Sequence, residues 1–149
     1  MLRVSLQLIL LVCVAIYAWR RGGWPERSVA VLFVMMGPAD ILYHSLFQTP
    51  VDYQSVDLGH LAIDLACFLG TLWVALKADR IWTLWVASSQ LISLMSHLWR
   101  LIDWTMQPMA YAILTMAPSY IAIVLIAWGT WNWQRRSQTR TRLTYSSVS

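Results

Sequence analysis

Long apolar stretches separated by short polar breaks run along the whole chain. Each of five stretches comes close to the roughly 20 apolar residues that an α-helix needs to cross the hydrocarbon core of a bilayer. The breaks carry basic residues, glycine and proline, which suit helix ends and the boundary between lipid and water. The pattern therefore predicts an all-α integral membrane bundle of about five transmembrane helices. The expected spans are residues 2–19, 28–47, 56–76, 81–102 and 109–133, and Trp24, Pro25 and Glu26 are expected in the turn before the second span.

The composition supports a lipid-facing exterior. Of the 149 residues, 58% are hydrophobic and only 12% are charged, against roughly 25% charged in an ordinary soluble domain. A soluble domain of this length could not hide so much apolar surface, because a small globule has too much surface for its volume. We expect residues 1–134 to form a single transmembrane domain and residues 135–149 to form a basic, flexible cytoplasmic tail.

Basic residues are distributed unevenly over the predicted connections. With five alternating spans, nine of the eleven Lys and Arg residues fall on one side of the membrane, and only Arg3 and Arg100 fall on the other. The positive-inside rule then places the N-terminus outside and the C-terminus in the cytoplasm, as expected for a bacterial inner membrane. Because these residues flank apolar runs, the net charge of +4 reflects topology, and nucleic acid is not an expected partner. The nine are Arg20, Arg21, Arg27, Lys77, Arg80, Arg135, Arg136, Arg140 and Arg142.

The ten tryptophans are expected to anchor the bundle at its two interfaces with water. An indole ring favours that depth because it is apolar while its N–H group seeks a polar partner. Eight of the ten lie near the predicted cytoplasmic ends of the spans, and Trp99 and Trp104 lie near the outer ends.

Ionisable residues inside the apolar stretches form the pattern that points to chemistry. The second span carries Asp40 and His44, the third carries His60 and Asp64, and the fourth carries His97. Residues four apart share one face of a helix, and two antiparallel neighbours ordered D-x3-H and H-x3-D bring like residues to the same level. At about 1.5 Å per residue, the aspartates lie roughly 10 Å deep and the first two histidines roughly 5 Å deep. All five side chains are therefore expected to face one pocket near the outer surface.

This cluster allows several interpretations. A carboxylate in the apolar slab costs about 2.5–3.5 kcal/mol on insertion scales, so each aspartate needs a partner. One interpretation is mutual hydrogen bonding that ties three helices together. Another is a metal site with His44, His60 and His97 as ligands and Asp40 and Asp64 as further ligands or imidazole partners, because this donor set suits zinc or another divalent ion. A b-type haem between two histidines and a proton relay are further alternatives.

The three histidines, aspartate and serine on membrane helices resemble the zinc hydrolases of the alkaline ceramidase and adiponectin receptor superfamily. Ser93-x3-His97 is similar to their S-x3-H element. Those proteins have seven helices and a paired H-x3-H on the last one, whereas the fifth stretch of this chain has no histidine. The resemblance covers a few residues and implies hydrolysis by analogy. Length, helix count and tryptophan content are also similar to the tryptophan-rich sensory protein family, whose motifs do not align with this chain.

Two functional hypotheses follow. The first is a small membrane protein whose outward-facing His/Asp pocket binds a divalent metal such as zinc, which would activate water to hydrolyse a lipid-like substrate. The second is a non-catalytic accessory or structural subunit that docks onto a larger membrane complex or another copy of the chain. In that case the polar cluster serves helix packing. The lipid bilayer is an expected partner under both hypotheses.

Overall fold

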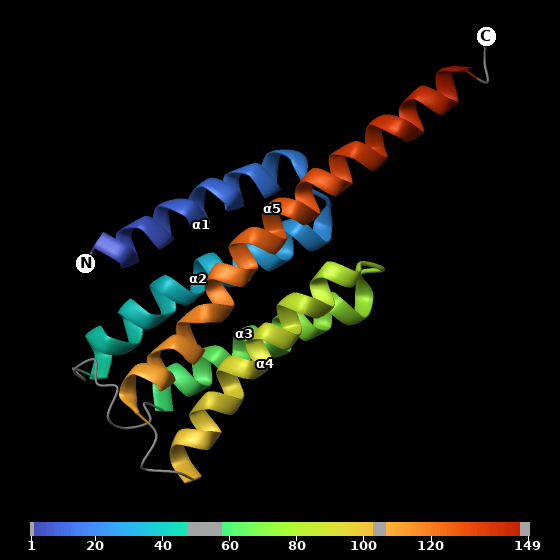
Figure 1. Cartoon of the computed structure of the whole chain (residues 1–149). Helices are drawn as coiled ribbons and strands as arrows, with labels where there is room; N and C mark the ends of the chain where they lie inside the picture. The colour runs from blue at the N-terminus through green and yellow to red at the C-terminus, as the bar shows by residue number, and fades with distance from the viewer. Residues whose placement is uncertain (1, 48–57, 103–106, 147–149) are drawn as a thin grey trace.

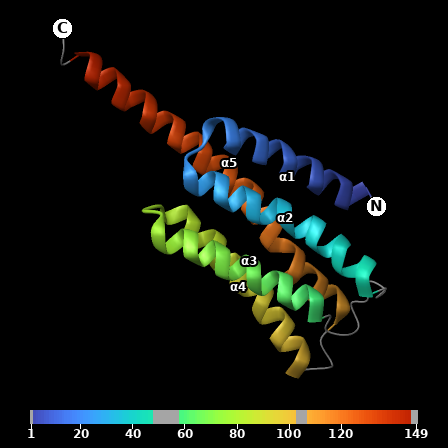
Figure 2. The same cartoon turned by 180° about the vertical axis from the view of Figure 1, so that it is seen from behind.

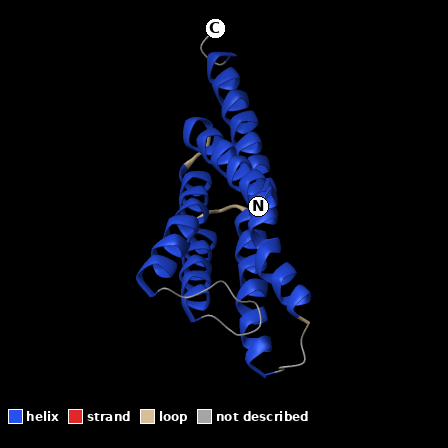
Figure 3. Cartoon of the chain, turned by 90° about the vertical axis from the view of Figure 1, so that its left-hand side faces the viewer, coloured by secondary structure: helices blue, strands red, loops and turns tan. Residues whose placement is uncertain are grey.

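Five α-helices make up the part of the chain that the structure describes. The computed structural model describes residues 2–47, 58–102 and 107–146, and no strand occurs within these ranges (Figure 3). The helices are α1 (Leu2–Arg21), α2 (Trp24–Phe47), α3 (Leu58–Lys77), α4 (Ile81–Ile102) and α5 (Pro108–Ser146). Three segments are long and apolar enough to cross a membrane, namely α2, α3 and Met109–Thr139 of α5. The predicted all-α class and the membrane-like character of the helices are thus confirmed.

The connection between α1 and α2 is shorter than predicted. Residues 24–26 form the first turn of α2, where the sequence pattern had indicated a turn before the helix. Proline is favoured in a first helical turn because its missing N–H group needs no partner there. The Glu26 side chain caps this helix by accepting a hydrogen bond from the Gly23 backbone N–H at 3.0 Å. A Cβ atom at Gly22 would lie 2.6 Å from a backbone carbonyl oxygen of α1, so this tight connection requires glycine.

Helix α5 extends beyond its predicted end at residue 133. It continues to Ser146 and projects away from the other helices (Figure 1). The extension contains glutamine and arginine, which are good helix formers, and no glycine or proline follows Gly129. The predicted C-terminal tail is therefore helical over residues 135–146, and its flexibility stays a prediction.

The helices form a closed ring. Each helix packs against its neighbours in the chain, α1 also packs against α5, and a contact between α2 and α5 crosses the ring. Successive helices run in opposite directions, so the α1–α2 and α3–α4 turns lie at one end (Figures 1 and 2). We call this the basic end, because Arg20, Arg21, Lys77 and Arg80 lie at or beside these turns. The opposite end is called the site end.

Many polar side chains are buried, and large apolar side chains face outward on every helix, in contrast to a soluble protein. Exposed aliphatic and aromatic side chains occur on all five helices. Helix α4 shows the contrast clearly, since Leu84, Ile92 and Trp99 are exposed while its polar residues other than Ser88 are buried. An inward polar face lowers the average hydropathy of this helix without placing polar atoms against lipid. The buried polar residues of α4 are Thr83, Ser89, Gln90, Ser93, Ser96, His97 and Arg100.

The interior of the ring changes character along its length. Toward the basic end, all five helices contribute to an apolar core that includes Ala18, Val29, Val74, Val86 and Ile126. Toward the site end the interior holds Asp64, His97 and Arg100, and the polar side chains buried toward the basic end are Glu26, Thr71, Thr83 and Thr130. The apolar half holds the helices together by packing, so that the polar half can hold functional groups.

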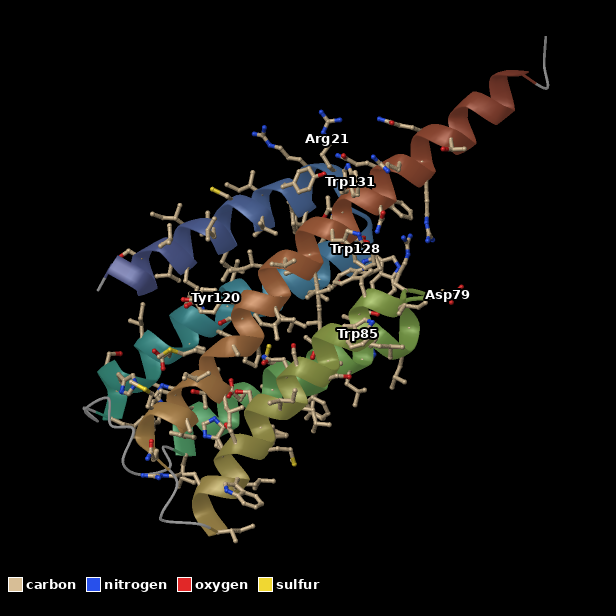
Figure 4. All side chains as sticks on the ribbon, in the orientation of Figure 1. Arg21, Asp79, Trp85, Tyr120, Trp128 and Trp131 are labelled. Carbon is tan, nitrogen blue, oxygen red and sulfur yellow. The ribbon has the colours of Figure 1, made fainter. Side chains whose placement is uncertain are left out.

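Exposed tryptophans and cations lie together at the basic end. Figure 4 shows Arg21, Asp79 and Trp131 there. Four cations lie over indole rings, an arrangement that suits the headgroup region of a bilayer. Trp82 departs from the predicted belt, because it is only 4% exposed and packs against Gly129 in the core; Trp104 lies outside the described residues. The pairs are Arg27 with Trp19, Lys77 with Trp73, Arg80 with Trp133 and Arg135 with Trp131, at 3.7–5.8 Å from the ring centroids.

Candidate metal centre and the cavity beside it

A cavity of about 250 Å³ lies in the polar half of the ring. All five helices contribute to its wall. The wall combines ionisable groups with apolar surface, as expected for a site that takes a ligand with polar and apolar parts. The ionisable groups are Asp40, His60, Asp64, His97 and Tyr111, and the apolar surface includes Leu11, Phe33, Met36 and Ile63.

Three side chains from α2 and α3 lie close enough to share one metal ion. One ligand atom from each of Asp40, His44 and His60 lies within 4.8 Å of the other two. The Oδ1 atom of Asp40 is 2.8 Å from Nε2 of His60 and 3.5 Å from Nε2 of His44. The two imidazole rings are in contact, with centroids 5.1 Å apart. Because all three residues are only partly buried, an ion can reach them.

The local sequence explains why these side chains meet. Asp40 and His44 are one turn apart on α2 and so share a face. On α3, Gly59 lies against the ring of Tyr43, and a Cβ atom at this position would overlap that ring. The glycine therefore allows a close approach of α2 to α3 beside His60. Tyr43 also meets both imidazoles edge to face, with centroids 5.3 Å from His44 and 6.4 Å from His60.

The two separations from Asp40 Oδ1 to the imidazole nitrogens are of the size found in a tetrahedral zinc site, and all three ligand atoms lie within 4.8 Å of one another. Zinc bonds to nitrogen and oxygen of about 2.0–2.2 Å place neighbouring ligand atoms of a tetrahedron about 3.3 Å apart. The separations of 2.8 and 3.5 Å lie on either side of this value. The Asp40 Oδ1 atom is shielded from solvent, and within the described chain no hydrogen bond of good geometry reaches it, although His60 stands at ion-pair distance. This oxygen therefore lies between imidazole nitrogens of two helices, an arrangement that a shared cation could use.

A second polar group lines the same cavity and is almost fully buried. The Asp64 carboxylate on α3 accepts a hydrogen bond from the Ser93 hydroxyl on α4 at 2.6 Å. The same oxygen, Oδ2, lies 3.0 Å from Nε2 of His97. On the other side of that imidazole, Nδ1 lies 2.6 Å from the hydroxyl of Tyr111 on α5. With His97 only 2% exposed, these hydrogen bonds are shielded from solvent and tie three helices together.

The structure therefore divides the five predicted ligands into two groups. Asp40, His44 and His60 form the group of metal-site dimensions, which fits the metal interpretation. Asp64 and His97 pair with each other, which fits the interpretation of hydrogen bonds between helices. All of these residues except His44 line the cavity, so the two groups face a common space.

Sequence reasoning missed Tyr111. A single tyrosine near the start of a membrane helix is ordinarily assigned to the interface, and one residue gives no spacing signal. The similar depth of Tyr111 and His97 could nevertheless be inferred, because Tyr111 lies three residues inside α5 and His97 lies five residues before the end of the antiparallel α4. A further polar contact was missed for the same reason: at the cavity wall Gln7 of α1 donates a hydrogen bond to the Ser119 hydroxyl at 2.6 Å.

The arrangement of His44 and His60 does not suit a haem ligated by both histidines. The rings of His44 and His60 are in contact, with centroids 5.1 Å apart, so no haem plane fits between them. Comparison with known proteins assigns no family: no protein-family model matches the chain, and searches of curated proteins and of solved structures return no match.

Proposed function

We propose that this chain is a five-span membrane protein that binds a divalent metal ion, preferably zinc, through Asp40, His44 and His60. The bound ion would activate water to hydrolyse a lipid-like substrate held in the adjacent cavity. The observation that carries the proposal is the convergence of these three side chains beside a cavity to which all five helices contribute.

The distribution of polar groups supports five spans. The outward faces of α1 and α4 are apolar like those of the other helices, and the polar residues of α4 are directed into the ring. A ring of five packed helices exposes no unpaired backbone group to lipid along the spans. The basic residues and their tryptophan partners gather at one end, which we place in the cytoplasm, so that the site end faces outward.

The donor set favours zinc among the divalent ions. Two imidazoles and one carboxylate recur in catalytic zinc sites, in which the fourth position is left to water or substrate. The same set also occurs in non-haem iron sites, so the metal content of the purified protein decides between them. Magnesium and calcium prefer all-oxygen coordination and fit less well.

The cavity supports hydrolysis of an amphipathic molecule. Its ionisable part adjoins Asp40 and His60, and its apolar part includes Phe33 and Met36. A substrate with an acyl chain would place that chain against the apolar wall and its ester or amide carbonyl near the ion. A metal ion in such a position polarises the carbonyl and lowers the cost of generating hydroxide from water.

A second candidate function rests on the buried hydrogen bonds of Asp64. These bonds join α3 to α4, and the His97–Tyr111 bond adds α5, so together they support the alternative of a non-catalytic accessory subunit whose polar cluster holds helices in place. Such a subunit should co-migrate with a larger assembly when it is purified in mild detergent. Purification as a single species with bound metal contradicts this alternative.

Elemental analysis of protein purified without added metal tests the proposed centre. We expect about one equivalent of a single first-row metal in the wild type, and less than about 0.1 equivalent after Asp40→Asn or His60→Ala, because each change removes a ligand. Asp79→Asn is the matched control, since Asp79 is an exposed acid in the turn at the opposite end. His97→Gln should retain the metal. A wild type that binds no more zinc than Asp40→Asn, even after dialysis against zinc, refutes the proposal.

A further inference from the structure

Asp64, His97 and Tyr111 form a continuous chain of hydrogen bonds that ends on the cavity wall. We infer that this chain is a proton relay, in which the Tyr111 hydroxyl exchanges protons with the attacking water and the leaving group. The inference rests on the proposed hydrolysis and assigns its acid–base group. It also gives His97 and Asp64 a function other than metal binding.

The directions of the hydrogen bonds are mutually consistent. The Asp64 carboxylate acts only as an acceptor, so both Ser93 and Nε2–H of His97 donate to its Oδ2 atom at 2.6 and 3.0 Å. A neutral imidazole that donates from Nε2 must accept at Nδ1, where the Tyr111 hydroxyl lies at 2.6 Å. In this tautomer the hydroxyl proton of Tyr111 is directed at the nitrogen that would receive it.

The position of these hydrogen bonds indicates a role beyond holding helices together. A structural tie is complete once each donor has an acceptor, and it needs no free space beside it. Here Asp64, His97 and Tyr111 all line the cavity that also adjoins the candidate metal ligands Asp40 and His60. The arrangement of acid, imidazole and hydroxyl follows the same logic as a nucleophile, base and orienting acid, but with tyrosine as the terminal group.

The proposed proton transfers balance over one turnover. As the attacking water forms a C–O bond to the substrate carbonyl carbon, it loses a proton to the Tyr111 oxygen, while the Tyr111 hydroxyl proton moves to Nδ1 of His97. The Asp64 carboxylate stabilises the imidazolium formed. When the bond to the leaving oxygen or nitrogen breaks, the proton returns through Tyr111 to that atom. One water is consumed, and all three side chains regain their starting states.

Tyr111→Phe tests the relay because it removes one hydroxyl and keeps the ring. With zinc-loaded protein and 4-nitrophenyl octanoate as the probe, we expect kcat to fall about 10²- to 10⁴-fold, the usual contribution of general acid–base catalysis, with KM within about twofold and the metal content unchanged. Tyr17→Phe is the matched control. Its hydroxyl makes a comparable bond between helices, to Gln134 at 3.1 Å, and does not line the cavity.

A spectroscopic readout tests the positioning of His97 without turnover. The chain has three histidines, so ¹⁵N-histidine labelling gives a small set of ring signals, and His97→Gln identifies those of His97. The relay requires the neutral Nε2–H tautomer, with an Nδ1 signal that shifts in Tyr111→Phe and not in Tyr17→Phe. The Nδ1–H tautomer or an imidazolium overturns the relay.

The outcomes separate the relay from the proposed function. Normal wild-type turnover with Tyr111→Phe within about threefold of it overturns the relay and leaves metal-dependent hydrolysis standing. Absence of turnover in metal-loaded wild type overturns hydrolysis and the relay together. A large loss of kcat in Tyr111→Phe together with loss of the metal also overturns the relay, because the hydroxyl then acts on the metal site.

Discussion

Replacing Asp64 in two ways will reveal the charge state of the buried Asp64–His97 pair. Asp64 Oδ2 accepts one hydrogen bond from Ser93 and contacts Nε2 of His97, and both donors are shielded from solvent. Asp64→Ala removes this acceptor and leaves two buried donors, at about 1–3 kcal/mol each, or about 2–6 kcal/mol together. Side-chain hydrogen bonds between membrane helices average about 0.6 kcal/mol, which sets a lower value of about 1.2 kcal/mol for two.

Asp64→Asn separates the charge from the hydrogen bonds. The carboxamide oxygen still accepts from Ser93 and His97, and the cost of a carboxylate within the slab, about 2.5–3.5 kcal/mol, is removed. With a neutral His97, the Asn variant should therefore be at least as stable as the wild type. With an imidazolium, it would contain a buried cation without its counter-ion, which destabilises by about 3–5 kcal/mol. We expect the neutral form, since it lets the Tyr111 hydroxyl donate to Nδ1.

Reversible unfolding in mixed dodecyl maltoside and SDS micelles measures these free energies. The ten tryptophans provide the fluorescence signal, and a chelator removes any contribution from bound metal. The expected order of unfolding free energy is Asn at or above wild type, with Ala below wild type by at least about 1 kcal/mol. Asp79→Asn, in an exposed turn, controls for general effects of removing a carboxylate. If Asn instead loses 3 kcal/mol or more, the reasoning is refuted and His97 is a cation in the folded protein.

Two further predictions concern the packing of the site and the topology. Gly59→Ala should weaken zinc binding about 5- to 150-fold, as an overpacking cost of about 1–3 kcal/mol displaces the Tyr43 ring from the histidines. Gly70→Ala is its control, because the new Cβ meets only the flexible end of a leucine, and equal affinities in competition titrations with a chelator contradict the argument. In a cysteine-free background, Asp79→Cys should react with an impermeant maleimide only from the cytoplasm and Gln107→Cys only from outside. Labelling of both from one side excludes the proposed topology.

The sequence predicted the features that depend on one helix at a time. The apolar run at residues 81–102 coincides with α4, and the four-residue spacing of Asp40 and His44 does place both on one face. It did not predict where α2 begins, because a proline in a first turn resembles a proline in a loop until the Glu26 cap is seen. It also set the end of α5 at the last apolar residue, although the polar residues that follow are themselves helix formers.

The division of the site into two groups could not be predicted in the same way. Whether His97 meets His60 or Asp64 depends on how far α4 is rotated about its axis relative to α3, and one residue of rotation changes the facing side chain by about 100°. That rotation is set by packing across the whole bundle, including Trp82 against Gly129 at the other end. The contact of Tyr111 with His97 involves a third helix, so residue spacing along one helix could not predict it either.

Charge balance links the two groups of the cavity. With neutral imidazoles, the ionised forms of Asp40 and Asp64 place two negative charges in one partly enclosed space, and each carboxylate costs about 2.5–3.5 kcal/mol in the apolar slab. A divalent cation bound beside Asp40 would offset negative charge in the space that Asp64, the acceptor for Ser93 and His97, also faces. The proposed metal centre and the proposed relay therefore face one cavity.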